Sequence, residues 1–186
     1  MEVHFSLIPT KRTDLRLLHR MSIHYSQPKG FVGRSICYAV VCNNIYYGHI
    51  VGGSATLHLP GRDKFLGVGS LNSIVNNIFY NISPPENQKY PIRNFSVQIL
   101  KKFMEQIQVD WMEKYGDRVT GFESLVEKPR TGEIYRRAGW TLVGETKGYT
   151  CKRVGGMEIR EKYTGTRVWD YTNLRPKLVW CYKVQA

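Results

Sequence analysis

Two apolar runs separated by a short amphipathic segment constrain the fold of this chain most strongly. Val119–Val126 is apolar and bounded by turn residues, which predicts a buried strand. Gly132 then begins a short helical segment, and Gly139 stands where a left-handed residue commonly ends a helix. Trp140–Val143 begins the next strand. The sequence therefore predicts a strand, a tight turn, a short helix and a second strand in direct succession.

Tyr135 lies in this short helix, four residues before Gly139 and beside the apolar face formed by Ile134 and Ala138. The Tyr-x-x-x-Gly-aromatic pattern after a buried strand resembles the last conserved block of the GNAT-fold acyltransferases. In those enzymes the tyrosine at this place often protonates the departing thiolate of coenzyme A. The alternative is a tyrosine that only packs the corner between the two strands.

The same periodicities predict the other elements. A helix is expected over Asp14–His24, with Thr13 as its N-cap and Leu15, Leu18 and Met21 along one side. The remaining predictions are strands at Arg34–Cys42, Ile45–Val51, Leu71–Ile82 and Leu178–Val184, a loop at Leu57–Gly69, and a long helix at about Asn94–Tyr115.

Two of these elements carry further signals. Asn43 and Asn44 suit a two-residue hairpin turn, and Gly52–Ser54 is expected to end the returning strand. Asn76 and Asn77, in the middle of the predicted central strand, indicate a bulge, side chains directed into a cleft, or a local backbone hydrogen bond. The long helix has an apolar stripe at spacings of three and four, which predicts core: Ile92, Phe95, Ile99, Phe103, Ile107 and Trp111.

Length and composition favour a single domain over residues 1–186. The order of the predicted elements and the GNAT resemblance imply an α/β (α+β) fold, with a GNAT-like, mixed but mainly antiparallel sheet flanked by helices on both faces. No apolar run approaches the roughly 20 residues of a membrane span, and the first residues lack the apolar core of a signal peptide. The four cysteines have no CxxC spacing and are expected to be reduced thiols. We therefore expect a cytoplasmic protein that does not bind membranes.

The net charge of +12, from 27 basic and 15 acidic residues, indicates an anionic partner such as phosphate, DNA, RNA or an anionic cofactor. Solubility alone is the alternative explanation. Basic residues alternate with aromatic ones over residues 147–177, before the last strand, which is the combination that a nucleic-acid surface needs; a solvated loop is the alternative. The predicted nucleic-acid contacts are Lys152, Arg153, Arg160, Lys162, Arg167, Trp169 and Tyr171.

The start of the long helix is a second candidate for binding an anion. Exposed amides beside Arg93, Asn94 and Ser96 suit a phosphate group, so these three residues are the predicted cofactor contacts. The glycines of the usual coenzyme A loop are missing there, which makes acetyl-CoA a less favoured donor.

The order of these motifs resembles two related groups: the Mom family of phage proteins and the DruA-type domain of Druantia anti-phage systems. The resemblance rests on residues 24–26, on the hairpin strand ending at 53, on 75–77, on 115–116, and on 132–140 followed by 144–146. Mom proteins convert DNA adenine to its N6-carbamoylmethyl form and so protect phage DNA from restriction.

The Mom resemblance implies a GNAT-derived transferase that acts on double-stranded DNA, with His24, Tyr25, Glu127 and Tyr135 lining the site. It also implies that iron could be required, with His24 and Glu127 as metal ligands. It does not imply which molecule donates the transferred group. Glu127 departs from the family pattern, which more often has Asp, and the longer side chain would shift a ligand or base.

Three hypotheses follow for the function. The first is a Mom-type transferase acting on the N6 amine of adenine. The second is a coenzyme A-dependent N-acyltransferase that acts on a small-molecule or protein amine. The third is a non-catalytic DNA-binding component of an anti-phage system.

Overall fold

Seven strands form one sheet in the order β1-β2-β3-β4-β5-β11-β6 in a computed structural model of the chain. All neighbouring strands are antiparallel except β4 and β5, which are parallel. The strands are β1 (Phe5–Thr10), β2 (Ser35–Cys42), β3 (Ile45–Ser54), β4 (Ile74–Tyr80), β5 (Gly121–Glu127), β6 (Thr141–Glu145) and β11 (Lys177–Lys183). The structure describes residues 4–25, 30–31, 33–67, 70–80, 82–86, 88–154, 157–158, 160–161, 164–166, 168–172 and 174–185.

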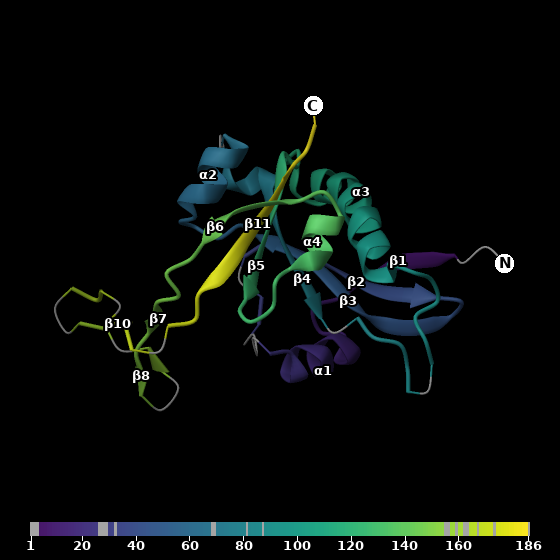
Figure 1. Cartoon of the computed structure of the whole chain (residues 1–186), viewed down its shortest axis with the longest axis horizontal. Helices are drawn as coiled ribbons and strands as arrows, with labels where there is room; N and C mark the ends of the chain where they lie inside the picture. The colour runs from purple at the N-terminus through teal and green to yellow at the C-terminus, as the bar shows by residue number, and fades with distance from the viewer. Residues whose placement is uncertain are drawn as a thin grey trace.

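Helices lie on both faces of the sheet (Figure 1). One face carries α3 (Phe95–Tyr115) and α4 (Glu133–Arg137), which share the main core with inward residues of β2 to β5. The other face carries α1 (Leu15–Ile23), packed on β2 to β4, and α2 (Pro60–Leu66), which contacts β6 and β11. The predicted fold class, a mainly antiparallel mixed sheet flanked by helices, is confirmed.

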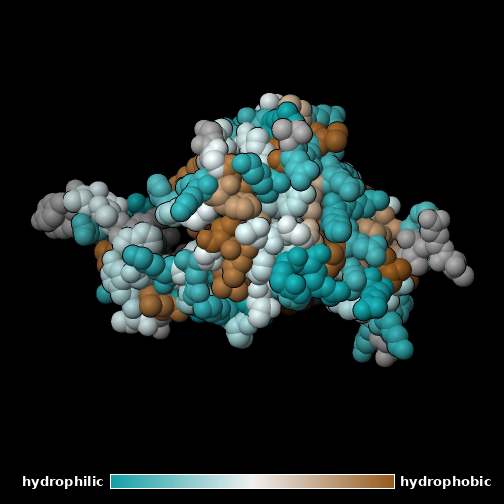
Figure 2. Space-filling model, turned by 45° about the horizontal axis from the view of Figure 1, so that its top comes forward, coloured by the Kyte–Doolittle hydropathy of each residue, from teal (hydrophilic) through white to brown (hydrophobic). Residues whose placement is uncertain are grey.

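The segment between β6 and β11 forms two small two-stranded sheets that extend beyond the main sheet (Figure 1). One joins β7 (Thr150–Cys151) to β10 (Trp169–Asp170), and the other joins β8 (Arg153–Val154) to β9 (Met157–Glu158). Figure 2 shows that one face of the molecule is mainly hydrophilic, with hydrophobic residues gathered into small patches. No helix among the described residues is long and apolar enough to cross a membrane.

Several local predictions are confirmed. Asn43 and Asn44 both have positive φ, 48° and 62°, as a type I′ hairpin turn requires. The predicted stripe of the long helix is buried from Phe95 to Trp111. Gly139 has a φ of 88° immediately after α4 and Ala138, in the left-handed region that favours glycine.

The prediction for the first helix is wrong in two details. Asp14, not Thr13, is the N-cap, and its carboxylate accepts a hydrogen bond from the Arg16 amide at 2.9 Å. The buried face is formed by Leu17 and Met21, whereas Leu15 and Leu18 are exposed. The helix is therefore rotated relative to the predicted face.

Three further predictions are corrected. The predicted loop contains α2, with Pro60 at its first position, where a missing N–H has no helical partner to lose. Strand β3 continues through Gly52, which pairs with Ile36 of β2 and with Asn77 of β4. The helix α3 packs closely on this position, because a Cβ at Gly52 would lie 2.1 Å from Cδ1 of Ile107. In addition, β4 is shorter than predicted, because Leu71–Ser73 forms a 3-10 helix before it.

Candidate active site

A fork between β4 and β5 lies at the centre of the candidate site. Their parallel pairing joins Ile74–Asn76 to Gly121–Glu123 and does not extend to the later residues of either strand, all of which are described. Beyond that point β4 stays paired with β3 and β5 stays paired with β11. The two strands therefore separate, and their facing backbone edges border an opening in the sheet.

A cavity of about 770 Å³ occupies this opening. Successive side chains of a strand point to opposite faces of a sheet. Both Asn76 and Asn77 of β4 line the cavity, and so do Leu125 and Val126 of β5, so the cavity reaches both faces. It is lined by Ile23, His24, Tyr25, Asn76, Asn77, Ile78, Ile82, Ser96, Ser124, Leu125, Val126, Arg130, Thr131, Gly132, Glu133, Ile134, Tyr135 and Lys177.

On the α3/α4 side, three buried polar residues meet at the cavity wall. The Tyr135 hydroxyl donates to Oδ1 of Asn77 at 3.1 Å, and the Ser124 hydroxyl lies 2.7 Å from the Tyr135 hydroxyl oxygen. Ser124 Oγ also lies 3.0 Å from the backbone carbonyl oxygen of Asn77. Tyr135 therefore joins the two sides of the fork, and its ring packs 4.9 Å from that of Trp140.

Burial sets the chemistry available to this group. It raises the pKa of Tyr135, and the Ser124 hydrogen bond opposes that shift only in part. The hydroxyl is thus protonated at neutral pH and can give a proton but not accept one as a base. Asn77 is 1% exposed, and its Nδ2 has no hydrogen-bond partner among the described residues. This buried donor can serve an oxygen atom placed in the cavity.

On the α1 side, the cavity opens beside His24, Tyr25, Arg130 and Lys177. The Arg130 guanidinium lies 3.7 Å from the centroid of the Tyr25 ring, and the His24 and Tyr25 rings are 4.2 Å apart. Burial raises the pKa of Tyr25, while a hydrogen bond from the Glu127 backbone opposes that shift. Glu127 itself is half-buried and does not line the cavity.

A second hollow of about 720 Å³ surrounds the start of α3 and shares Ser96, Glu133 and Ile134 with the fork cavity. The first hydrogen bonds of the helix run from the amides of residues 97 and 98 to Asn94, so the Phe95 and Ser96 amides precede them. The side chains that line this hollow include Lys89, Arg93 and Arg137.

Asn94 occupies this hollow in the left-handed conformation, with φ 61° and ψ 28°. Glycine usually takes that conformation, and asparagine is among the few other residues that tolerate it. Its side-chain oxygen accepts a hydrogen bond from Arg137 of α4. Asn94 therefore takes a backbone conformation at the start of α3 that more often belongs to glycine.

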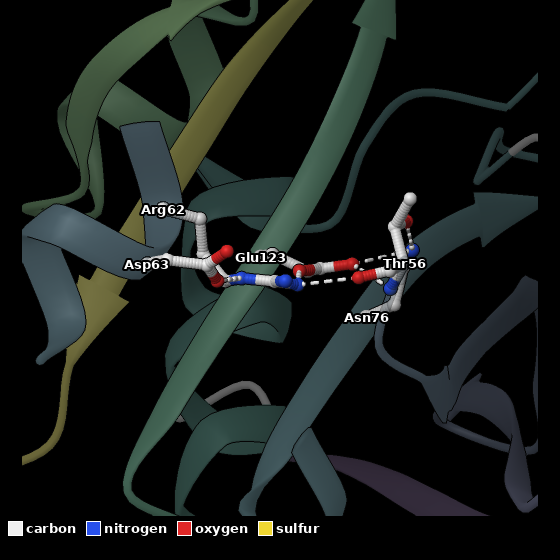
Figure 3. Close-up of polar contacts among 5 residues, drawn as sticks. All are labelled: Thr56, Arg62, Asp63, Asn76 and Glu123. Atoms are coloured by element: carbon white, nitrogen blue, oxygen red, sulfur yellow. Dashed lines mark hydrogen bonds and ion pairs between the residues drawn. The ribbon is translucent and has the colours of Figure 1, made fainter. Parts of the chain in front are cut away.

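On the opposite face of β5, Glu123 is fully buried at the last paired position of the fork (Figure 3). Its carboxylate accepts hydrogen bonds from the Thr56 amide at 2.6 Å and from Nδ2 of Asn76 at 3.1 Å, and it pairs with Arg62 of α2. Arg62, also fully buried, further bonds Asp63 at 2.7 Å. This cluster links α2, β4 and β5 where the strands separate.

The structure brings some predicted site residues together and separates others. His24, Tyr25 and Tyr135 line one cavity, and Ser96 lines both hollows; Arg93 and Asn94 line only the second. Among the described residues, no group of three or more His, Cys, Asp and Glu side chains is arranged to hold a metal ion. A metal at His24 and Glu127 stays a prediction.

The predicted nucleic-acid residues that the structure describes do not line the cavity and lie in the two small sheets and their connections. Trp169 and Tyr171 are exposed, and the Tyr171 ring packs 4.8 Å from that of Tyr149. Lys152 is exposed, and Arg160 donates to the Gly165 carbonyl at 3.0 Å. The Arg153 side chain, Lys162 and Arg167 lie outside the described part.

Solved structures of similar shape cover nearly the whole chain. A Bacillus subtilis acetyltransferase in complex with CoA aligns with a TM-score of 0.57 and 10% identity, over 99% of this chain and 100% of the other. The fold is that of the GNAT acetyltransferases. A GNAT family acetyltransferase from Elizabethkingia anophelis with acetyl-CoA bound gives 0.57 and 9%, over 97% and 98% of the two chains.

A spermidine N-acetyltransferase chimera from Vibrio cholerae with the same GNAT fold gives a TM-score of 0.56 and 10% identity, over 96% of this chain and 95% of the other. No family model and no curated protein matches the sequence. One fold can host many different reactions, so only the residues of the site can indicate which reaction this protein catalyses.

Sequence reasoning did not identify Ser124, Arg130 and Lys177 as cavity residues. Ser124 lies inside an apolar strand run, where a hydroxyl needs a partner. No local sequence pattern places Arg130 and Lys177 in the cavity. Only the pairing of β5 with β11 brings them to one end of the fork. One of the alternatives for Asn76 and Asn77, side chains directed into a cleft, agrees with the cavity lining.

Proposed function

We propose that this protein is an N-acyltransferase that moves an acyl group from a coenzyme A thioester to an amine. One observation carries the proposal: the fork cavity is lined by Tyr135 and by Asn77, whose Nδ2 has no partner among the described residues, and it shares lining residues with a basic hollow at the start of α3. The first part suits acyl transfer, and the second suits the phosphates of the donor.

The residues of the second hollow fit a diphosphate. The Phe95 and Ser96 amides lie at the positive end of the helix dipole, where anions are stabilised. Lys89, Arg93 and Arg137 add positive charge beside them. The fork cavity, bordered by the backbone edges of β4 and β5, would hold the narrower arm of the donor.

When bound, the thioester supplies an activated acyl group: the amine nitrogen forms a C–N bond, the C–S bond breaks, the amine loses a proton, and the sulfur gains one. Tyr135 is protonated at neutral pH, as an ordinary tyrosine is, and burial raises its pKa further; its hydroxyl can supply the proton to sulfur. Asn77 can donate Nδ2–H to the carbonyl oxygen as charge develops there. His24, on the α1 side, can accept the amine proton.

Calorimetry with coenzyme A, followed by acetyl transfer from acetyl-CoA to a panel of amines, tests this function. We expect coenzyme A to bind the parent protein and Arg93→Ala to weaken binding about tenfold, the scale of a charge-assisted phosphate contact. Lys101→Ala is the matched control, because Lys101 is exposed on the same helix outside the hollow. Failure of the parent to bind coenzyme A would overturn the proposal.

A second candidate is Mom-type modification of the adenine N6 amine in double-stranded DNA. It is favoured by His24, Tyr25 and Tyr135, which line one cavity as the resemblance implies, and by the charge of +12. Against it, Glu127 does not line the cavity. Iron would then be expected at His24 and Glu127, and metal analysis of the parent and of His24→Ala tests that expectation.

Mass spectrometry of nucleosides from cells that express the protein separates the two candidates, because only the second predicts a modified adenosine. DNA affinity should also fall steeply with salt if the basic segment contacts several phosphates. A change below about threefold between 50 and 200 mM salt excludes several phosphate contacts. That result together with unmodified DNA would eliminate the second candidate.

A further inference from the structure

We infer that the acceptor amine also carries an anionic group, a carboxylate or a phosphate, which Arg130 and Lys177 hold at the α1 end of the fork cavity. This inference rests on the proposed acyl transfer and names its substrate class. The two ends of the cavity differ in chemistry. Tyr135 and Asn77 lie on the α3/α4 side, whereas two cationic side chains lie at the end beside α1.

Arg130 is oriented for an anion before any ligand binds. Its guanidinium carbon lies 3.7 Å from the centroid of the Tyr25 ring, and Tyr25 in turn packs on His24 at 4.2 Å. Contact with the aromatic face fixes the plane of the guanidinium while leaving its N–H groups at the edge. Those N–H groups match the two oxygens of a carboxylate or phosphate.

The protein does not neutralise these two cations by close contact. Among the described residues, neither Arg130 nor Lys177 has a carboxylate within the 4.0 Å of an ion pair. Two nearby carboxylates are already paired elsewhere: Glu145 with Lys128, and Glu133 with Arg136.

Glu127 is the remaining acid at this end, opposite Lys177 in the β5–β11 ladder. It does not line the cavity, whereas Lys177 does. The cavity wall at this end therefore carries an excess of positive charge.

This charge determines which amines are accepted. A second positive charge on the acceptor would lie beside Arg130 and Lys177 and be repelled, so a polyamine is a poor substrate. A negative group would gain charge-assisted hydrogen bonds and leave the amine directed toward the fork. The anionic group itself takes no part in bond making or breaking.

The donor does not need these cations. Its phosphates are placed at the start of α3, where Lys89, Arg93 and Arg137 provide separate positive charge. Substitution of Arg130 should therefore change acceptor use and leave coenzyme A affinity unchanged.

The test compares four amines with acetyl-CoA as donor: 4-aminobutyrate, 2-aminoethyl phosphate, 4-aminobutanamide and 1,4-diaminobutane. We expect kcat/KM for at least one of the two anionic amines to exceed that of the amide about tenfold or more, with the diamine lowest. Arg130→Gln should reduce the anionic rate about tenfold and barely change the amide rate. Arg118→Gln is the control, because Arg118 is exposed and lies outside the cavity.

A preference for the amide or the diamine, or an equal loss for all amines in Arg130→Gln, would overturn the inference. Direct calorimetry of 2-aminoethyl phosphate with the parent, Arg130→Gln and Lys177→Gln makes the test independent of turnover. Binding that weakens in both variants supports the anion site even if coenzyme A does not bind, in which case only the proposed function fails. The anion site would be disproved by two results together. Calorimetry would show no binding of 2-aminoethyl phosphate or equal binding in all three proteins, and turnover would show no preference for anionic amines.

Discussion

Glu123 of β5 and Arg62 of α2 form an ion pair in which neither side chain is exposed to solvent. The carboxylate also accepts hydrogen bonds from the Thr56 amide and from Asn76 of β4. Glu123 and Asn76 form the last rung between β4 and β5, so this one carboxylate connects the two strands where they separate (Figure 3).

Removing one partner of this pair should destabilise the protein strongly. In Glu123→Gln, the Arg62 guanidinium loses its fully buried counter-ion and keeps only the partly exposed Asp63, and breaking a buried pair typically costs about 3–5 kcal/mol. Urea denaturation measures the loss in the free energy of unfolding. The double variant Glu123→Gln/Arg62→Met should recover part of it, and Arg136→Gln, which breaks an exposed pair, should leave the midpoint almost unchanged. Equal midpoints for parent and Glu123→Gln would contradict the connecting role.

Tyr135→Phe separates chemistry from packing. The ring and its contact with Trp140 are kept, so stability should fall by only about 1 kcal/mol, the scale of one net hydrogen bond. Acyl transfer should nevertheless fall roughly 100-fold, the usual contribution of a positioned proton donor. Melting temperature and turnover are measured on the same samples. A Phe variant as active as the parent would reduce Tyr135 to a packing residue.

Asn77→Asp keeps an oxygen for the Tyr135 hydroxyl but removes the unpaired Nδ2–H donors. If they stabilise charge on the acyl oxygen, kcat should fall about 100-fold or more, as when one such donor is removed elsewhere. Coenzyme A, which lacks the acyl oxygen, should still bind with unchanged affinity by calorimetry. A matching loss of coenzyme A affinity would show that Asn77 only shapes the cavity.

His49 makes stability depend on pH. Burial lowers its pKa to about 4, with Asp14 opposing that shift and Arg16 and Arg20 reinforcing it, while Nδ1 lies 2.6 Å from the Tyr46 hydroxyl. The unfolded chain therefore binds a proton more readily than the folded one. The contribution of His49 to stability is complete above its unfolded pKa of about 6.5 and is lost progressively as the pH falls toward 4.

Between pH 7.5 and 4.5 this loss should reach about 2–3 kcal/mol. Denaturation of the parent and of His49→Asn at both pH values measures it, because the carboxylates shared by the two proteins cancel in the difference. His19→Asn, on the exposed side of α1, is the control and should behave as the parent does. Identical pH dependence in all three proteins would show that His49 does not titrate in this range.

The sheet and its long helix could be predicted because their signals are local. The stripe on α3 repeats at helical spacing, and Asn43 and Asn44 specify a hairpin turn whatever surrounds them. Gly52 was misread as the end of a strand. A Cβ at this position would lie 2.1 Å from Cδ1 of Ile107 on α3, a residue 55 positions away in sequence whose approach no local pattern contains.

The candidate site was harder to predict because long-range pairing assembles it. Tyr135 was found from its own motif, but Asn77 and Ser124, which complete its hydrogen bonds, come from two different strands. The burial of Arg62 had an indirect signal: Glu123 interrupts an apolar run, and a buried carboxylate requires a partner. The sequence indicates that Glu123 needs a positively charged partner, but it does not indicate which residue provides the charge.

The opening that crosses the sheet bears on the order in which molecules bind and leave. Two ligands that enter from opposite faces need not pass each other, so neither has to bind first or leave last. Initial rates should therefore follow a sequential scheme with random addition, whereas ping-pong kinetics would require a covalent acyl-protein. The separation of two strands would in this way determine the kinetic scheme of the whole protein.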